Sequence, residues 1–328
     1  MKKLKITMKV MKEILLVEVF NFFKKNLSKR IILVFAIFLG LAITYSFDDS
    51  KVVNAEVISA TWSDNQGNSV DWSFDEETGT LTIGKEKEKQ RLSETNQLNI
   101  RPAWESIISN YQKAITKIIF VGEVEANENS SYLFKNYFRN TEKDCSIDLT
   151  NLSVDKVKNM EGIFYSCTRL KELDLSNFNT SKVENMDSMF YSCANLSTLS
   201  LGDKFNTSKV KNMNLMFYDC SSLSELDLSN FNTSEVTDMR GMFLYCSNLK
   251  TLTFGDKFDT SKVETMSMMF LDCSSLSELD LSNFNTSEVT EMRGMFGNCS
   301  NLSTLSFGEK FNTSNVEYMI GMFNGCSS

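Results

Sequence analysis

The stretch CSSLSELDLSNFNTSEVTDMRGMF, residues 220–243, decides the fold, because it returns almost unchanged 53 residues later. Residues 220–249 and 273–302 are identical at 27 of 30 positions. Within this duplication two shorter units of 26 and 27 residues alternate. Self-similarity at a period of about 20–50 residues is typical of a repeat array, in which each copy buries its apolar side chains against the next.

The cysteines follow the same repeat. Successive cysteines from Cys145 onward are separated by 22, 26, 27, 26, 27, 26 and 27 residues. This even spacing predicts a ladder of small buried side chains, and we expect no metal site, since a ladder does not converge four ligands. Disulfide pairing stays open as an alternative, because neighbouring rungs lie within disulfide reach. The predicted ladder comprises Cys167, Cys193, Cys220, Cys246, Cys273, Cys299 and Cys326.

Each repeat divides into two pieces with different periodicity. Leu226 and Leu228 alternate with polar residues, which predicts a short strand with one buried face. From Val236 onward apolar residues recur at steps of three and four, which predicts a short helical turn. We therefore expect an α/β leucine-rich-repeat solenoid with short parallel strands, short helical turns and a core of Met and Phe. The strands should centre on residues 118, 147, 173, 199, 226, 252, 279 and 305.

A polar corner joins the two pieces of each repeat. Asparagine recurs there, and we expect its side chain to form a hydrogen-bonded ladder. The corner also accounts for the two repeat lengths, because SNF at residues 229–231 becomes GDKF at residues 255–258 in every second copy. The predicted ladder residues are Asn179, Asn206, Asn232, Asn285 and Asn312.

The composition excludes several function classes. The chain has 328 residues, 42% of them hydrophobic, and no histidine, which removes the commonest general base and metal ligand. We predict no enzyme, no catalytic residue and no cofactor, since no pocket with converging titratable groups is visible outside residues 56–114. Residues 56–328 carry 24 basic and 38 acidic residues, a net charge of −14. This acidic body disfavours nucleic acid as a partner.

The N-terminal segment differs from the rest of the chain. Residues 1–55 carry ten Lys or Arg and four Asp or Glu, and they contain the uncharged stretch 31–47. This order predicts a secretory signal cleaved between Ala55 and Glu56, with an uncleaved membrane anchor as the alternative. Membrane contact is expected only through this segment.

Residues 56–114 should form a small β-rich cap ahead of the repeat region, residues 115–328. We expect a hairpin formed by residues 70–74 and 80–83, a solvated loop at 85–91 and a helix at 103–113. The chain stops in the middle of a repeat. We therefore expect a truncated array that frays after about Phe311.

The unit at residues 220–243 resembles the 26-residue repeat of the BspA-like leucine-rich-repeat surface proteins, over about residues 115–328. Residues 72–84 and 104–121 also resemble that family's entry region. The resemblance implies a secreted or cell-surface bacterial protein that adheres to host matrix proteins, glycans or other cells. It implies no catalytic residues.

The outward positions of the predicted strands are the candidate binding face. They alternate acid and hydroxyl, and extended faces of this kind bind partners in other repeat arrays. A passive stalk or spacer without a specific ligand is the alternative. A calcium site is disfavoured, because single carboxylates two repeats apart cannot supply six to eight oxygens. The candidate residues are Asp174, Ser200, Asp227, Thr253, Asp280 and Ser306.

Overall fold

The computed structural model describes residues 57–64, 66–95, 115–139, 143 and 145–328. The chain divides into two compact units, Met1–Asn54 and Ala55–Ser328, and all described residues belong to the second unit. The predicted signal segment with its Ala55/Glu56 cleavage site and the predicted helix at 103–113 lie outside the described residues. Within the described ranges no helix is long and apolar enough to cross a membrane.

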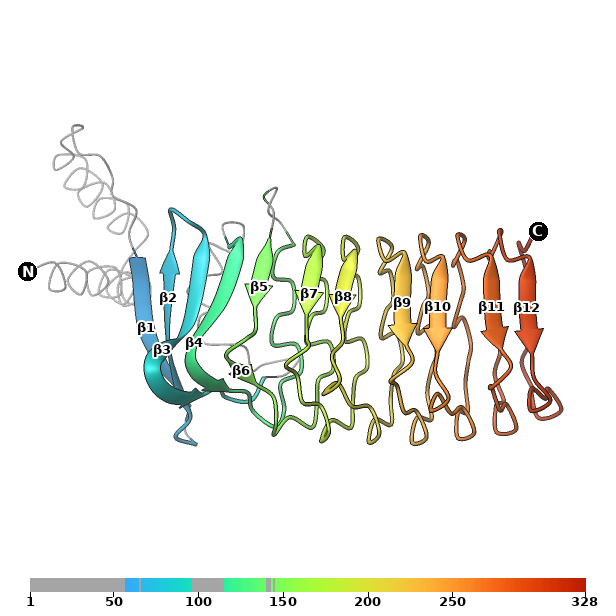
Figure 1. Ribbon diagram of the computed structural model, residues 1–328, viewed down its shortest axis with the longest axis horizontal. Helices are drawn as coiled ribbons and strands as arrows, with labels where there is room; N and C mark the ends of the chain where they lie inside the picture. Colours follow the sequence, from blue (N-terminus) through green and yellow to red (C-terminus); the bar gives the residue numbers. More distant parts are fainter. Residues whose placement is uncertain (1–56, 65, 96–114, 140–142, 144) are drawn as a thin grey trace, which may run out of the picture. The chain divides into compact units, whose positions relative to one another are not determined.

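The described chain begins with a mixed six-stranded sheet (Figure 1). Its strands run in the order β1-β2-β3-β4-β5. The short strand β6 also pairs with β4, nearer to the end of β4 than β5 does. Alternation buries Val70, Trp72 and Phe74 on one face of β2. The strands are β1 (Val57–Ser63), β2 (Ser69–Asp75), β3 (Thr80–Arg91), β4 (Lys117–Glu125), β5 (Ser146–Asp148) and β6 (Leu152–Ser153).

The predicted hairpin is confirmed, since β2 and β3 pair antiparallel with Trp72 opposite Ile83. The predicted loop at residues 85–91 is wrong, because β3 continues through it to Arg91. A shift of register between Gly84 and Lys89 keeps β3 paired with β4, so the charged side chains project outward from a strand.

One short strand follows in each later repeat (Figure 1). All eight predicted strand centres fall within observed strands, namely β4, β5 and the six strands of the later repeats. The alternating Leu-x-Leu pattern therefore located the strands correctly. The six are β7 (Glu172–Asp174), β8 (Thr198–Ser200), β9 (Glu225–Leu228), β10 (Thr251–Phe254), β11 (Glu278–Leu281) and β12 (Thr304–Phe307).

The expected α/β leucine-rich-repeat solenoid with helical turns is wrong. The described residues contain strands but no helix. The strands of the later repeats also do not form one continuous parallel sheet, because they pair only two by two, as β7-β8, β9-β10 and β11-β12.

A run of tight turns replaces each expected helix. Gly241, Phe243 and Tyr245 donate their N–H groups to carbonyls of the next repeat at 2.9 Å. The residues between them close turns within their own repeat, as Leu244 N–H does with Gly241 O at 3.1 Å. Gly241 and Tyr245 have positive φ values, 57° and 65°, which interrupt a right-handed helix. The apolar steps of three therefore reflect successive turns.

The predicted Met and Phe core is confirmed. Phe190, Phe217 and Phe243 are fully buried and stack with ring centroids 5.3 and 5.7 Å apart. Residues 312–328, where we expect fraying, form the same turns and accept hydrogen bonds from the preceding repeat. Gly294 N–H, for example, donates to Ile320 O at 2.9 Å.

Candidate functional site

The predicted binding face lies on the outward side of the paired strands. Register places Glu172 beside Thr198 and Asp174 beside Ser200, and the same acid and hydroxyl pairs recur in the next two sheets. All six candidate residues are exposed, whereas the leucines between the acids of β7, β9 and β11 are buried. The face therefore presents three acidic pairs, each next to a pair of hydroxyls, at intervals of two repeats.

The aspartates of this face also have a structural role. Oδ1 of Asp174, Asp227 and Asp280 accepts a hydrogen bond at 2.9 Å from the backbone N–H two residues later. This bond closes a turn at the end of each strand. Hydrogen bonding from Ser282 lowers the pKa of Asp280, so its carboxylate stays charged at neutral pH.

The cysteine ladder lies in the core. The first six cysteines of the ladder are buried and Cys326 is half-buried, and all seven are free thiols. Each thiol donates to the carbonyl of a phenylalanine in the preceding repeat, as Cys220 does to Phe190 O at 3.2 Å. Burial raises the pKa of Cys193 and of Cys246 to about 12. Such thiols pack as small apolar groups and are poor nucleophiles.

The ladder at the polar corner is formed by threonine, not by the predicted asparagines. The Thr260 hydroxyl donates to Asn285 O and accepts from Asn285 N–H, both at 2.8 Å. The asparagine side chains instead cap their own corners, as Asn285 Oδ1 does with Ser287 N–H. The Asn-Thr-Ser motif contained this signal, because a threonine stands in every copy. The corner threonines are Thr180, Thr207, Thr233, Thr260 and Thr286, all buried.

Sequence reasoning also missed a column of tyrosines. Tyr165, Tyr191 and Tyr218 stack face to face with centroids 4.4 and 4.2 Å apart. Because neighbouring tyrosines cover the faces of these rings, the column does not offer the open aromatic platform on which a sugar or base would stack. Its role is to join successive repeats.

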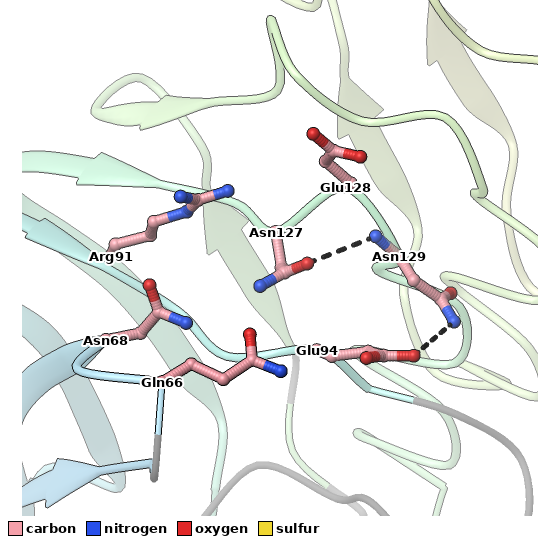
Figure 2. A pocket seen from close by; sticks show the side chains of 7 residues that line it. All are labelled: Gln66, Asn68, Arg91, Glu94, Asn127, Glu128 and Asn129. Carbon is pink, nitrogen blue, oxygen red and sulfur yellow. Dashed lines mark hydrogen bonds between the residues drawn. The ribbon is translucent and has the colours of Figure 1, made fainter.

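A polar cavity of about 430 Å³ lies beside the N-terminal sheet (Figure 2). Nε of Arg91 is buried there without a hydrogen-bond partner and lies 3.8 Å from Oε2 of Glu125. Glu94 accepts a hydrogen bond from Asn129, and Glu128 pairs with Lys158 outside the cavity wall. These groups offer hydrogen bonds to a small polar molecule but no nucleophile paired with a base. The described lining is Gln66, Asn68, Arg91, Glu94, Asn127, Glu128 and Asn129.

No group of three or more Cys, Asp or Glu side chains in the described part of the chain is arranged to hold a metal ion. The described features that a partner could contact therefore include the exposed strand face and the polar cavity beside the N-terminal sheet, whereas the thiol column is buried.

Comparison with known proteins gives one family. A model described as "Mycoplasma protein of unknown function, DUF285" matches twice, at residues 132–252 and 224–328. No curated protein and no solved structure matches the chain. The two matches together span residues 132–328, more than half of the chain, and they correspond to the repeats that carry the strand face. The chain therefore belongs to the DUF285 family.

Proposed function

We propose that the chain is an exported bacterial cell-surface protein that binds host matrix proteins, glycans or other cells through its outward strand face. The resemblance of the repeat to BspA-like surface proteins supports this proposal, and the match to a family described as a Mycoplasma protein supports a bacterial source. The N-terminal basic and apolar segment supports export.

The proposal rests on the exposed acidic residues of β7, β9 and β11. The ion pairs identified in the described chain join other residues than the six acids of β7, β9 and β11, which supports a role for their charge in binding a partner. Elsewhere the exposed acids are often paired internally, as Glu184 is with Lys211 at 2.9 Å and Glu235 with Lys262 at 2.7 Å. An uncompensated acidic strip favours a partner with a basic surface and speeds encounter with it.

A spacer without a ligand is the second candidate function. The turn that each strand aspartate closes gives that residue a structural purpose independent of any partner. A spacer needs a solvated strand face and nothing more.

The two functions are separated by removing charge while keeping the turns. The triple variant Asp174→Asn, Asp227→Asn and Asp280→Asn retains a side-chain acceptor at each strand end. Its control is Glu264→Gln, Glu288→Gln and Glu317→Gln, three exposed glutamates away from the strands, with the same change in net charge.

Binding is measured on a panel of immobilised matrix proteins, glycans and whole cells, at low and at physiological salt. An adhesive face predicts binding by the natural chain, its loss in the aspartate variant and its retention in the control. A spacer predicts no specific binding by any of the three proteins.

A further inference from the structure

The strand face is interrupted after every second repeat. β8 and β9 belong to different two-stranded sheets, and so do β10 and β11 (Figure 1). In contrast, isolated parallel β-bridges on the turn side join every repeat to the next, through Asn185, Asn212, Asp238 and Thr265. Successive repeats therefore stay in contact while their strands separate at these two places.

The separation exposes apolar side chains. Leu173 and Leu175 of the β7 repeat are 2% and 0% exposed, and the equivalent leucines of the β9 and β11 repeats are also buried. Leu199 and Leu201 of the β8 repeat are only half-buried, as are Leu252 and Phe254 of the β10 repeat. The half-buried residues belong to the strands that have no partner on their far side.

The inserted corner residue explains the two-repeat alternation. Gly202 lies in the longer corner, and a Cβ there would be 2.6 Å from the backbone of Ser176. At the equivalent Gly255 a Cβ would be 2.1 Å from Ser229 O. The longer corner thus packs tightly on the preceding repeat, which only glycine permits, and the strand that follows this corner is the one that does not pair with the strand before it.

The result is a groove lined by both apolar and acidic residues. The groove between β8 and β9 has a volume of about 260 Å³, and its lining includes Leu199 and Leu201 of the β8 repeat and Glu225, Leu226 and Asp227 of β9. Phe205 and Phe231, stacked at 5.8 Å, line it together with Ser200. Pockets for whole small molecules measure about 300–1,000 Å³, so this groove suits a single side chain.

The break between β10 and β11, 53 residues later, carries matching residues. Leu252 and Phe254 take the places of Leu199 and Leu201, and Glu278 and Asp280 those of Glu225 and Asp227. The Phe254 ring packs on Phe258 and Phe284, with centroids 4.4 and 5.2 Å apart, and so adds aromatic surface at this break. Over these two repeats the core phenylalanines are 5.7 and 5.5 Å apart, so the stack of repeats advances by about 11 Å from the first strand break to the second.

We propose that the groove between β8 and β9 and its counterpart at the break between β10 and β11 receive lysine or arginine side chains from one extended segment of a partner protein. The aliphatic stem would lie along the leucines and the charged head between the two carboxylates, the arrangement that suits a long basic side chain. This inference rests on the proposed binding function and names the partner's chemistry. In an extended or polyproline-II segment, residues three apart are roughly 9–10 Å apart, and polyproline II places them on the same side.

The test uses synthetic proline-rich peptides that carry two lysines separated by one, two or three residue steps, at equal total charge. Affinity for the full chain is measured by fluorescence anisotropy at low salt. The groove predicts that the three-step peptide binds most tightly. Glu225→Gln with Glu278→Gln should weaken it about tenfold. Its control, Glu264→Gln with Glu317→Gln, should leave the affinity unchanged. Thermal unfolding verifies that each variant is folded.

Equal affinity for all spacings, or equal loss in both double variants, would overturn the grooves as sites. If the aspartate triple variant still loses matrix binding in that case, the proposed adhesive function stands and only the grooves fall. If the peptides show the spacing preference but no matrix protein binds, the groove is supported and the matrix partner is refuted.

Discussion

The threonine ladder gives the sharpest test of what joins the repeats. Thr260 is fully buried, and its hydroxyl both donates to and accepts from the backbone of Asn285 in the next repeat. Thr260→Val keeps the shape of the side chain but leaves one carbonyl and one N–H unpaired at a largely buried position. At about 1–2 kcal/mol for each lost pairing, we expect a loss of roughly 2–4 kcal/mol in the free energy of unfolding.

For a chain of this size such a loss lowers the melting temperature by roughly 5–10 °C. Thr260→Ser keeps the hydroxyl and loses one methyl group, so it should cost only about 1 kcal/mol. Thr253→Val, on the exposed face of β10, is the control and should change stability by less than about 0.5 kcal/mol. The measurement is thermal and urea unfolding followed by circular dichroism. If Thr260→Ser proved more damaging than Thr260→Val, methyl packing and not the hydroxyl bridge would hold the corner.

Three further outcomes follow from the structure. Gly255→Ala should destabilise the chain by about 1–3 kcal/mol in urea, because its Cβ meets Ser229 O, whereas the exposed neighbouring change Asp256→Ala should be nearly neutral. Phe217→Ala should cost about 3–5 kcal/mol in the same assay and the half-exposed Phe323→Ala far less, so equal losses would contradict the stacked core. Because burial raises the pKa of Cys193 and Cys246 to about 12 while unfolded thiols ionise near pH 9, the unfolded chain releases protons first. Stability should therefore fall from about pH 9 toward pH 12, and Ellman's reagent at pH 8 should label the ladder thiols only after denaturation.

The strands could be predicted from sequence because a short alternating pattern has one structural meaning. Leu226, Asp227 and Leu228 need opposite environments on successive residues, and only an extended chain supplies them. The same reasoning located the exposed acids, since the residue between two buried leucines must point outward. Burial of the cysteines follows from their place in the apolar stripe.

The turn region was misread because a step of three residues is shared by two structures. A helix and a run of tight turns both return a side chain to the same side after three residues or slightly more. The distinguishing signal was glycine, which stands at the first left-handed position of several repeats, as Gly241 and Gly294 do. A glycine kept at one position in a helix would only weaken it, whereas a left-handed turn favours it.

The grooves could not be predicted from sequence, although the residue insertion that produces them was visible. An extra residue at a corner can form a bulge that leaves the strands paired or can displace the next strand. Here the strand after the longer corner is unpaired with the strand before it, and that outcome depends on how two repeats pack, as the close approach of Gly202 to the backbone of Ser176 illustrates.

The turn side of each repeat therefore provides most of the contacts that stabilise the array, and the strand side is available for recognition. Hydrogen bonds on the turn side run from every repeat to the next, and the buried phenylalanines, thiols and threonines lie along the same unbroken path. Strand pairing contributes only within each 53-residue unit. Because the array does not depend on continuous strand pairing, the strand side can open into grooves and vary its exposed residues without separating the repeats. Because the strand side contributes less to the stability of the array, its exposed residues can be replaced with less effect on the fold. The exposed acids of β7, β9 and β11 lie on this side.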